Sequence, residues 1–137
     1  MQARKETKTL FESHIMDRKD IRDAMFPDCP IRNVLSRMMD KWTLLVLYTL
    51  EHKDTLRFND IKRAIPDISQ KSLTVTLKSM EADGLVSRKV TPAVPVKVEY
   101  SLTERAMSVM PMLDQLLAWS LENFSGIIAD REKHSKE

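Results

Sequence analysis

The stretch 58–102 restricts the fold of this chain more than any other, because it opens with two short helical patterns separated by a tight break. The first pattern, 58–65, offers Asn59 as its cap and ends at Pro66, since proline cannot continue a helix. The second pattern, 69–83, follows almost at once. Two short helices joined by a tight turn predict a helix-turn-helix unit.

The second of these predicted helices has two different faces. Ser69 is a good N-terminal cap, and Gly84 is a good residue to end the helix. Three apolar residues at helical spacing predict the side that faces the core: Leu73, Leu77 and Met80. The opposite side is polar, basic and mostly short in side chain: Gln70, Lys71, Thr74, Val75 and Lys78. Periodicity alone does not decide whether this stripe contacts DNA or is a solvated surface.

The segment after Gly84 has the alternation of a β-hairpin. Residues 85–90 lead into a proline-containing turn at 91–95, and apolar residues then alternate with polar ones over 96–102. Three basic residues lie on the two predicted strands: Arg88, Lys89 and Lys97. A basic hairpin directly after a helix-turn-helix is typical of a wing that holds backbone phosphates beside a DNA groove. The order of elements therefore favours DNA contact by the basic stripe.

Three more helices are expected before this unit. A charged segment with few apolar residues predicts a helix over 8–26 whose thin apolar face packs on a partner. A core helix is expected to begin at Pro30 with Cys29 as the preceding cap, and its apolar residues recur at helical spacing: Ile31, Val34, Leu35, Met38 and Met39. Asp40 is expected to cap a buried central helix whose apolar positions are Trp42, Leu45, Val46, Leu47 and Leu50.

The last predicted helix, 103–124, begins at Thr103 and contains more large apolar residues than one buried stripe can hold. We expect Pro111 to kink or restart it, because proline removes a backbone donor. The surplus apolar surface predicts a partner, and a second copy of the chain is the simplest source. The sequence therefore predicts a homodimer, and the tail after Ala129 is expected to be frayed.

Together these patterns predict a mainly α fold with a small β-hairpin, namely a winged helix-turn-helix with additional N- and C-terminal dimerisation helices. Residues 1–26 are expected to form an N-terminal helical extension, and 126–137 a charged tail. The winged domain with its dimerisation helix occupies 27–125 in this division.

Composition excludes several other classes. The two glycines, Gly84 and Gly126, cannot build a glycine-rich phosphate loop. The single cysteine, Cys29, and the absence of a signal-like apolar start favour a reducing cytoplasm. The three histidines lie far apart without ligand-like neighbours, so we expect no metal site. The carboxylates form no recognisable acid/base motif, so we expect no enzymatic activity, and we expect no cofactor. The apolar stretches are too short to span a membrane.

The distribution of charge indicates where a polyanion would bind. The whole chain carries a net charge of only +2. Residues 61–97 hold seven basic and three acidic side chains, whereas 103–137 hold four basic and six acidic ones. Double-stranded DNA would therefore meet the middle of the chain. The alternative is a winged helix that docks protein, but such a module should present an apolar or acidic face where this chain has Lys71 and Lys78.

The sequence resembles the HxlR-type winged helix-turn-helix regulators of bacteria over 29 to about 119. The markers of the resemblance, in order along the chain, are Cys29-Pro30, Lys41-Trp42-Thr43, Arg57-Phe58-Asn59-Asp60-Ile61, Ile68-Ser69-Gln70-Lys71-Ser72-Leu73-Thr74, Asp83-Gly84-Leu85-Val86 and Pro95 through Val98-Glu99-Tyr100-Ser101-Leu102-Thr103-Glu104. The resemblance implies a dimer joined through the terminal helices, with the helix 69–83 in the major groove. The chain departs from the family pattern at Thr76, where arginine is common, and at Ala106, where glycine is common.

These observations define the expected sites of a sequence-specific transcriptional regulator acting on an inverted-repeat operator. The expected DNA-binding residues are Ser69, Gln70, Lys71, Ser72, Thr74, Val75, Lys78, Arg88, Lys89 and Lys97. Cys29 is a possible redox sensor, since relatives in the family use a thiol there and a helix start favours thiolate. Against sensing, Asp28 is adjacent and no second cysteine can resolve an oxidised thiol, so the structural reading is favoured. The sequence says nothing about a small-molecule effector.

Overall fold

The computed structural model describes residues 29–137, which form two compact units, 29–44 and 45–137. The expected helix 8–26 lies outside the described residues. In the first unit a π-helical turn, η1 (Ile31–Leu35), continues into the short helix α3 (Ser36–Met38). The helical conformation begins at Pro30, as predicted, and the Cys29 carbonyl accepts the backbone and side-chain N–H groups of Asn33, each at 3.1 Å.

The expectation that this first helix belongs to the core is wrong. Met38 is buried, but four of its apolar residues are 44–52% exposed: Ile31, Val34, Leu35 and Met39. Helical spacing places apolar residues on one face, and it does not say whether that face is covered within the same chain. In the single chain this apolar face is therefore exposed and accessible to a partner.

Helix α4 (Lys41–Lys53) begins as predicted, with Asp40 as its cap. One Asp40 carboxylate oxygen accepts the backbone N–H groups of Trp42 and Thr43, each at 3.2 Å. Three of the five predicted apolar positions are buried: Val46, Leu47 and Leu50. Leu45 is 40% exposed, so the helix is buried on one side only.

The predicted helix-turn-helix is confirmed as α5 (Phe58–Ala64) followed by α6 (Gln70–Ala82). The Ser69 hydroxyl caps α6 by accepting the backbone N–H of Ser72 at 3.0 Å. Three residues face the core as predicted: Leu73, Leu77 and Met80. Gly84 ends the helix with a φ of 72°, and the hydrogen bonds from Gly84 N to Glu81 O and from Leu85 N to Met80 O form a Schellman motif.

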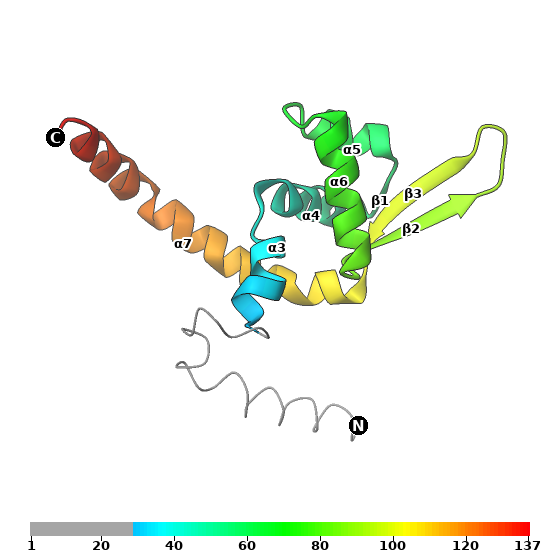
Figure 1. Cartoon of the computed structure of the whole chain (residues 1–137), viewed down its shortest axis with the longest axis horizontal. Helices are drawn as coiled ribbons and strands as arrows, with labels where there is room; N and C mark the ends of the chain where they lie inside the picture. The colour runs from blue at the N-terminus through cyan, green and yellow to red at the C-terminus, as the bar shows by residue number, and fades with distance from the viewer. Residues whose placement is uncertain (1–28) are drawn as a thin grey trace, which may run out of the picture. The chain divides into compact units, whose positions relative to one another are not determined.

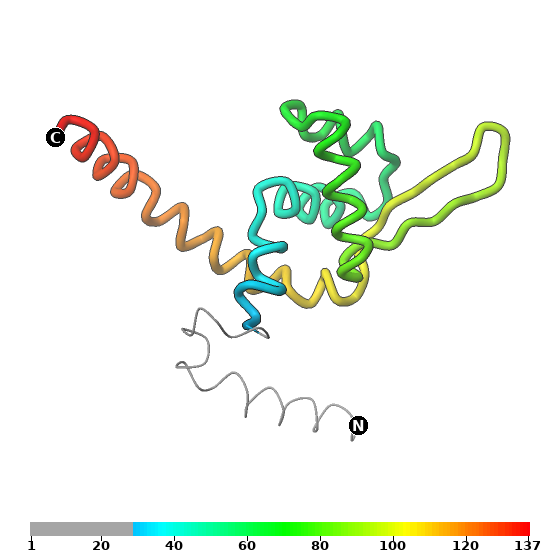
Figure 2. Tube along the Cα trace, in the orientation of Figure 1, coloured from blue at the N-terminus to red at the C-terminus, as the bar shows by residue number. Residues whose placement is uncertain are grey.

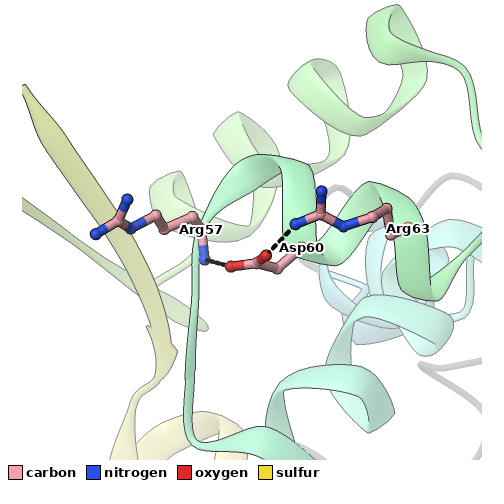
Figure 3. A network of polar contacts seen from close by, with 3 residues as sticks. All are labelled: Arg57, Asp60 and Arg63. Atoms are coloured by element: carbon pink, nitrogen blue, oxygen red, sulfur yellow. Dashed lines mark hydrogen bonds and ion pairs between the residues drawn. The ribbon is translucent and has the colours of Figure 1, made fainter. Parts of the chain in front are cut away.

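The predicted cap of α5 is wrong, because Asn59 lies inside the helix and Arg57 occupies the cap position. The Asp60 carboxylate accepts the backbone N–H of Arg57 at 3.2 Å and pairs with the Arg63 guanidinium at 2.5 Å, as Figure 3 shows. The Arg63 hydrogen bond, followed by that from Arg57, lowers the pKa of Asp60. The start of this helix is therefore stabilised by an acidic side chain at its third position, which accepts the backbone N–H of the cap residue.

The hairpin is confirmed as β2 (Val86–Thr91) and β3 (Lys97–Leu102), which pair antiparallel. Figure 1 shows it extending away from α5 and α6. A third strand, β1 (Thr55–Leu56), pairs with the other edge of β3, so the order of the sheet is β1-β3-β2. Strand β1 is not among the elements predicted from the sequence.

The last helix, α7 (Glu104–Ser135), is longer than predicted. Thr103 caps it, as expected, by accepting the backbone N–H of Ala106 at 3.2 Å. The helix does not restart at Pro111, although its trace changes direction between the first turns and the rest (Figure 2). The expectation of a frayed tail after Ala129 is wrong, since the helical hydrogen bonding continues through Ser135.

A hydrogen bond ties the last helix to α4 within the second unit. The Tyr48 hydroxyl donates to the Asp114 carboxylate at 3.0 Å. Desolvation, and then this hydrogen bond, raise the pKa of Tyr48 to about 12. In the part of the chain that the structure describes, no helix is both long and apolar enough to cross a membrane.

Candidate nucleic-acid interface

Four of the five residues of the predicted stripe of α6 are exposed. Gln70, Lys71 and Lys78 are exposed, and Val75 has 59% of its surface in solvent. Thr74 is half-buried, and its hydroxyl donates to the Gln70 carbonyl at 2.8 Å. The stripe therefore combines an amide, two ammonium groups and the apolar side chain of Val75.

The two serines of the predicted site act on the helix itself. Ser69 is exposed at the start of α6, and its hydroxyl oxygen holds the Ser72 backbone N–H. Such a start leaves the first backbone N–H groups of a helix pointing outward, where they attract an anion. Thr76, the position where the family pattern has arginine, is only 7% exposed and belongs to the core side of α6.

The register of the hairpin divides the three wing cations between two faces. Arg88 pairs with Tyr100, whereas Lys89 pairs with Glu99 and Thr91 pairs with Lys97. Because successive side chains of a strand point to opposite faces, Arg88 and Tyr100 share one face and the two lysines share the other. Lys97 also forms an ion pair with Glu99 at 3.4 Å. The three cations, predicted from the sequence as one group, are thus split between the two faces of the hairpin.

A cleft of about 350 Å³ joins α6 to the hairpin. It is lined by Phe58, Thr74, Leu77, Lys78, Glu81, Arg88 and Tyr100. The cleft thus brings together Thr74, Lys78 and Arg88, three residues of the predicted site from both the helix and the wing. The other predicted residues lie outside its lining.

Sequence reasoning missed the three remaining surface residues of this cleft: Phe58, Glu81 and Tyr100. Two of them had a signal. Glu81 follows Lys78 by three positions, so it continues the same stripe of α6. Tyr100 is an alternating residue of the second predicted strand, and the register opposite Arg88 would have placed it on that face.

A second hollow, of about 390 Å³, lies on α5 and is lined by Asn59, Lys62, Arg63 and Pro66. Of the two cations in this hollow, Arg63 forms an ion pair with Asp60, and Lys62 does not take part in that ion pair. Helix α5 therefore carries positive surface of its own.

Cys29 lies in the other unit, just before η1. Its side chain is only 2% exposed, and its carbonyl carries the two hydrogen bonds from Asn33. Such burial slows the reaction of a thiol with an oxidant or electrophile, because the sulfur must first become accessible to solvent.

Comparisons with known proteins agree with this architecture. The HxlR-like helix-turn-helix family matches residues 37–127. An uncharacterised HTH-type transcriptional regulator of Halalkalibacterium halodurans is 44% identical over 96 residues, which cover 70% of this chain and 85% of the relative. The chain therefore shares most of its length with a curated regulator.

Two solved structures share the fold. The redox regulator HypR in its oxidised form is 39% identical with a TM-score of 0.62, covering 69% of this chain and 97% of HypR. The reduced form of the transcriptional regulator YodB from Bacillus subtilis is 34% identical with a TM-score of 0.60, covering 66% of this chain and 87% of YodB. The fold, the basic helix-turn-helix and wing, and the family match together show that this chain belongs to the HxlR-like helix-turn-helix family of transcriptional regulators.

Proposed function

We propose that this regulator binds a specific inverted-repeat operator in double-stranded DNA as a homodimer. The observation that carries the proposal is the cleft that unites Thr74 and Lys78 of α6 with Arg88 of the wing. A helix in the major groove and a hairpin on the flanking backbone need such a continuous, cationic surface.

The base-reading group consists of four residues near the start of α6: Gln70, Lys71, Thr74 and Val75. Their chemistry fits base edges, because a glutamine amide can pair with adenine and a lysine can donate to guanine. The exposed Val75 supplies an apolar contact for a thymine methyl. Ser69 and Ser72, at the helix start, approach a backbone phosphate.

The backbone-holding group consists of four cations: Lys78, Arg88, Lys89 and Lys97. Since Arg88 lies on the opposite face of the hairpin from Lys89 and Lys97, the wing reaches phosphates on both of its sides. These contacts position the protein and carry no sequence information by themselves. Replacing Lys89 by alanine should weaken all sequences alike and reduce the salt slope by about one unit.

Exposed apolar side chains support the homodimer. On α7, seven large apolar residues are 45–71% exposed: Met107, Met112, Leu116, Leu117, Trp119, Leu121 and Phe124. The exposed face of η1 and α3 adds more apolar surface of the same kind. A second copy covers such a face, and two-fold symmetry would then set the half-sites about 34 Å apart, or a multiple of that distance.

Binding-site selection from genomic fragments, followed by gel shifts at two or more salt concentrations, tests DNA recognition. We expect an inverted repeat and affinity that falls steeply with salt. Failure to bind any fragment even at low salt would favour the protein-docking alternative. Sedimentation at micromolar concentration tests the dimer, and a monomer that still binds the operator tightly would contradict it.

Thiol sensing at Cys29 is the finer part of this proposal. The likeness to HypR, a redox regulator, and to YodB, whose structure is also known after diamide treatment, supports it. Because Cys29 is buried and is the single cysteine, its oxidation requires local opening and gives an intersubunit or small-thiol disulfide.

Operator affinity before and after diamide, in the wild type and in Cys29→Ser, tests the sensor. We expect diamide to change the affinity of the wild type only. Unchanged affinity while mass spectrometry shows Cys29 modified would assign this cysteine to packing alone.

A further inference from the structure

The cleft between α6 and the hairpin has a composition that base reading does not require. Its cations come from two different elements, Lys78 from α6 and Arg88 from β2, and Tyr100 from β3 lines the same cleft. We propose that this cleft seats one phosphodiester of the DNA backbone, held jointly by Lys78, Arg88 and the Tyr100 hydroxyl. The proposal rests on the proposed function and adds Tyr100 to it as a contact residue.

The charge of the lining fits one phosphodiester. Lys78 and Arg88 contribute two positive charges and Glu81 contributes one negative charge, so the cleft carries a net charge of +1. A backbone phosphodiester carries one negative charge. Within residues 29–137, Lys78 and Arg88 form no ion pair, in contrast to Lys97, which is paired with Glu99. Both cations of the cleft are therefore available to an anion.

The register of the sheet explains why the hydroxyl and the guanidinium act on the same atoms. Arg88 and Tyr100 are directly paired across β2 and β3, where opposite side chains lie about 5 Å apart at Cβ. A tyrosine hydroxyl is a neutral donor that reaches farther than a serine or threonine hydroxyl, and such side chains commonly contact DNA phosphates. Phe58, which lines the cleft and is half-buried, offers apolar surface suited to a deoxyribose ring.

A shared phosphate predicts a particular dependence on salt. The slope of log K against log salt counts neutralised phosphates, at about 0.9 per phosphate for duplex DNA. If Lys78 and Arg88 hold the same phosphate, either cation alone still neutralises it. Lys78→Ala and Arg88→Ala should each change the slope by much less than one unit, and the double variant should reduce it by about 0.9.

The matched control is a second pair of variants, Arg88→Ala and Lys89→Ala, because these two residues lie on opposite faces of the hairpin. Arg88 and Lys89 are adjacent in β2 but point to different sides, so they contact different phosphates. The slope change of Arg88→Ala combined with Lys89→Ala should equal the sum of the two single changes. The three cations of these two pairs are exposed, so their replacement leaves the fold intact, which circular dichroism checks.

Tyr100→Phe tests the hydroxyl separately. Removing a neutral donor to a charged acceptor should weaken binding of every sequence by roughly tenfold and leave the salt slope unchanged. Tyr48→Phe is the control, because it also deletes one tyrosine hydroxyl but at the contact with Asp114. This control should bind DNA as the wild type does.

The outcomes separate this inference from the proposed function. Wild-type protein that binds no DNA at low salt overturns both. Wild-type protein that binds DNA, with additive slope changes for the Lys78 and Arg88 variants and no effect of Tyr100→Phe, overturns the shared seat and leaves DNA binding in place. Non-additive slopes for this pair, additive slopes for Arg88 with Lys89, and weaker binding by Tyr100→Phe support it.

Discussion

Replacement of Gly84 by alanine should destabilise the protein at the junction between α6 and the wing. Gly84 has a φ of 72°, the left-handed conformation in which a side chain clashes with the backbone. A Cβ atom at this position would also collide with the end of the Arg105 side chain, which donates a hydrogen bond to the Asp83 carbonyl at 3.0 Å. The backbone and one side-chain contact both oppose the substitution.

The expected magnitude follows from these parts. The left-handed conformation costs a residue with a Cβ about 1–2 kcal/mol. Moving Arg105 away from an exposed carbonyl adds about 0.5 kcal/mol, because the guanidinium is flexible and can be solvated instead. Replacing glycine also restricts the unfolded chain, which stabilises the protein by about 0.4–1 kcal/mol. The net loss is about 1 kcal/mol, or a fall in Tm of roughly 3–5 °C.

The second glycine provides a control of opposite sign. Gly126 lies inside α7, and nothing lies within 4 Å of the position that a Cβ would occupy. Alanine there should stabilise the helix by about 0.5–1 kcal/mol, because glycine is a poor helix former. Urea unfolding of the wild type and of both variants, at one fixed protein concentration in case association contributes, measures the difference.

Two results would refute this reasoning. An alanine at Gly84 that is neutral or stabilising would mean that the turn adopts another conformation. Equal destabilisation by Gly84→Ala and by Gly84→Asn would also contradict it, because asparagine tolerates the left-handed conformation better than alanine does. A loss that disappears in the background of Arg105→Ala would assign the effect to the side-chain collision alone.

Three further predictions concern other caps and the tyrosine of α4. Ser69→Ala removes the cap of α6 and should lower the free energy of unfolding, measured with urea, by about 1 kcal/mol. Ser69→Asn keeps a side-chain acceptor at the cap and should retain most of the wild-type free energy of unfolding. Asp54 has a φ of 62° after α4, so Asp54→Gly should raise the free energy of unfolding by up to about 1 kcal/mol, visible as a higher urea midpoint. Because the pKa of Tyr48 is raised to about 12, its contribution to stability is complete below the unfolded pKa near 10 and is lost as the pH rises from about 10 to about 12. Ultraviolet titration of tyrosinate should show this late-titrating group in the wild type and not in Tyr48→Phe.

The features predicted correctly are those that local chemistry decides. Ser69 and Gly84 bound α6 as expected, since a cap hydroxyl and a left-handed glycine each act within a few residues. Thr103 and Asp40 start their helices for the same reason. At α5 the local rule failed, because Asp60 could satisfy the cap from inside the helix and the helix began before Asn59.

The features missed depend on partners distant in the sequence. Strand β1 has two residues and exists only because Thr55 and Leu56 pair with Ser101 and Tyr100. The cleft likewise combines residues of α5, α6 and the two wing strands, and no periodicity within one element shows that they meet. The exposure of Ile31, together with its neighbours on the same face, could not be predicted because burial depends on what covers a helix.

The start of α7 holds the turn between α6 and the wing. The Thr103 hydroxyl donates to the Gly84 carbonyl at 2.6 Å, and its backbone N–H donates to the Leu85 carbonyl at 3.1 Å. Arg105 adds its bond to the Asp83 carbonyl. Residues 83–85 are also the end of α6 and the approach to β2, so one short segment sets the position of the helix relative to the wing. Three hydrogen bonds therefore link the start of α7 to the segment that joins α6, which carries Lys78, to β2, which carries Arg88. If the chain associates through α7 and binds DNA with this surface, as proposed, the two events would be coupled at this turn, and the strain that a side chain at Gly84 imposes should weaken operator binding more than its effect on stability alone would.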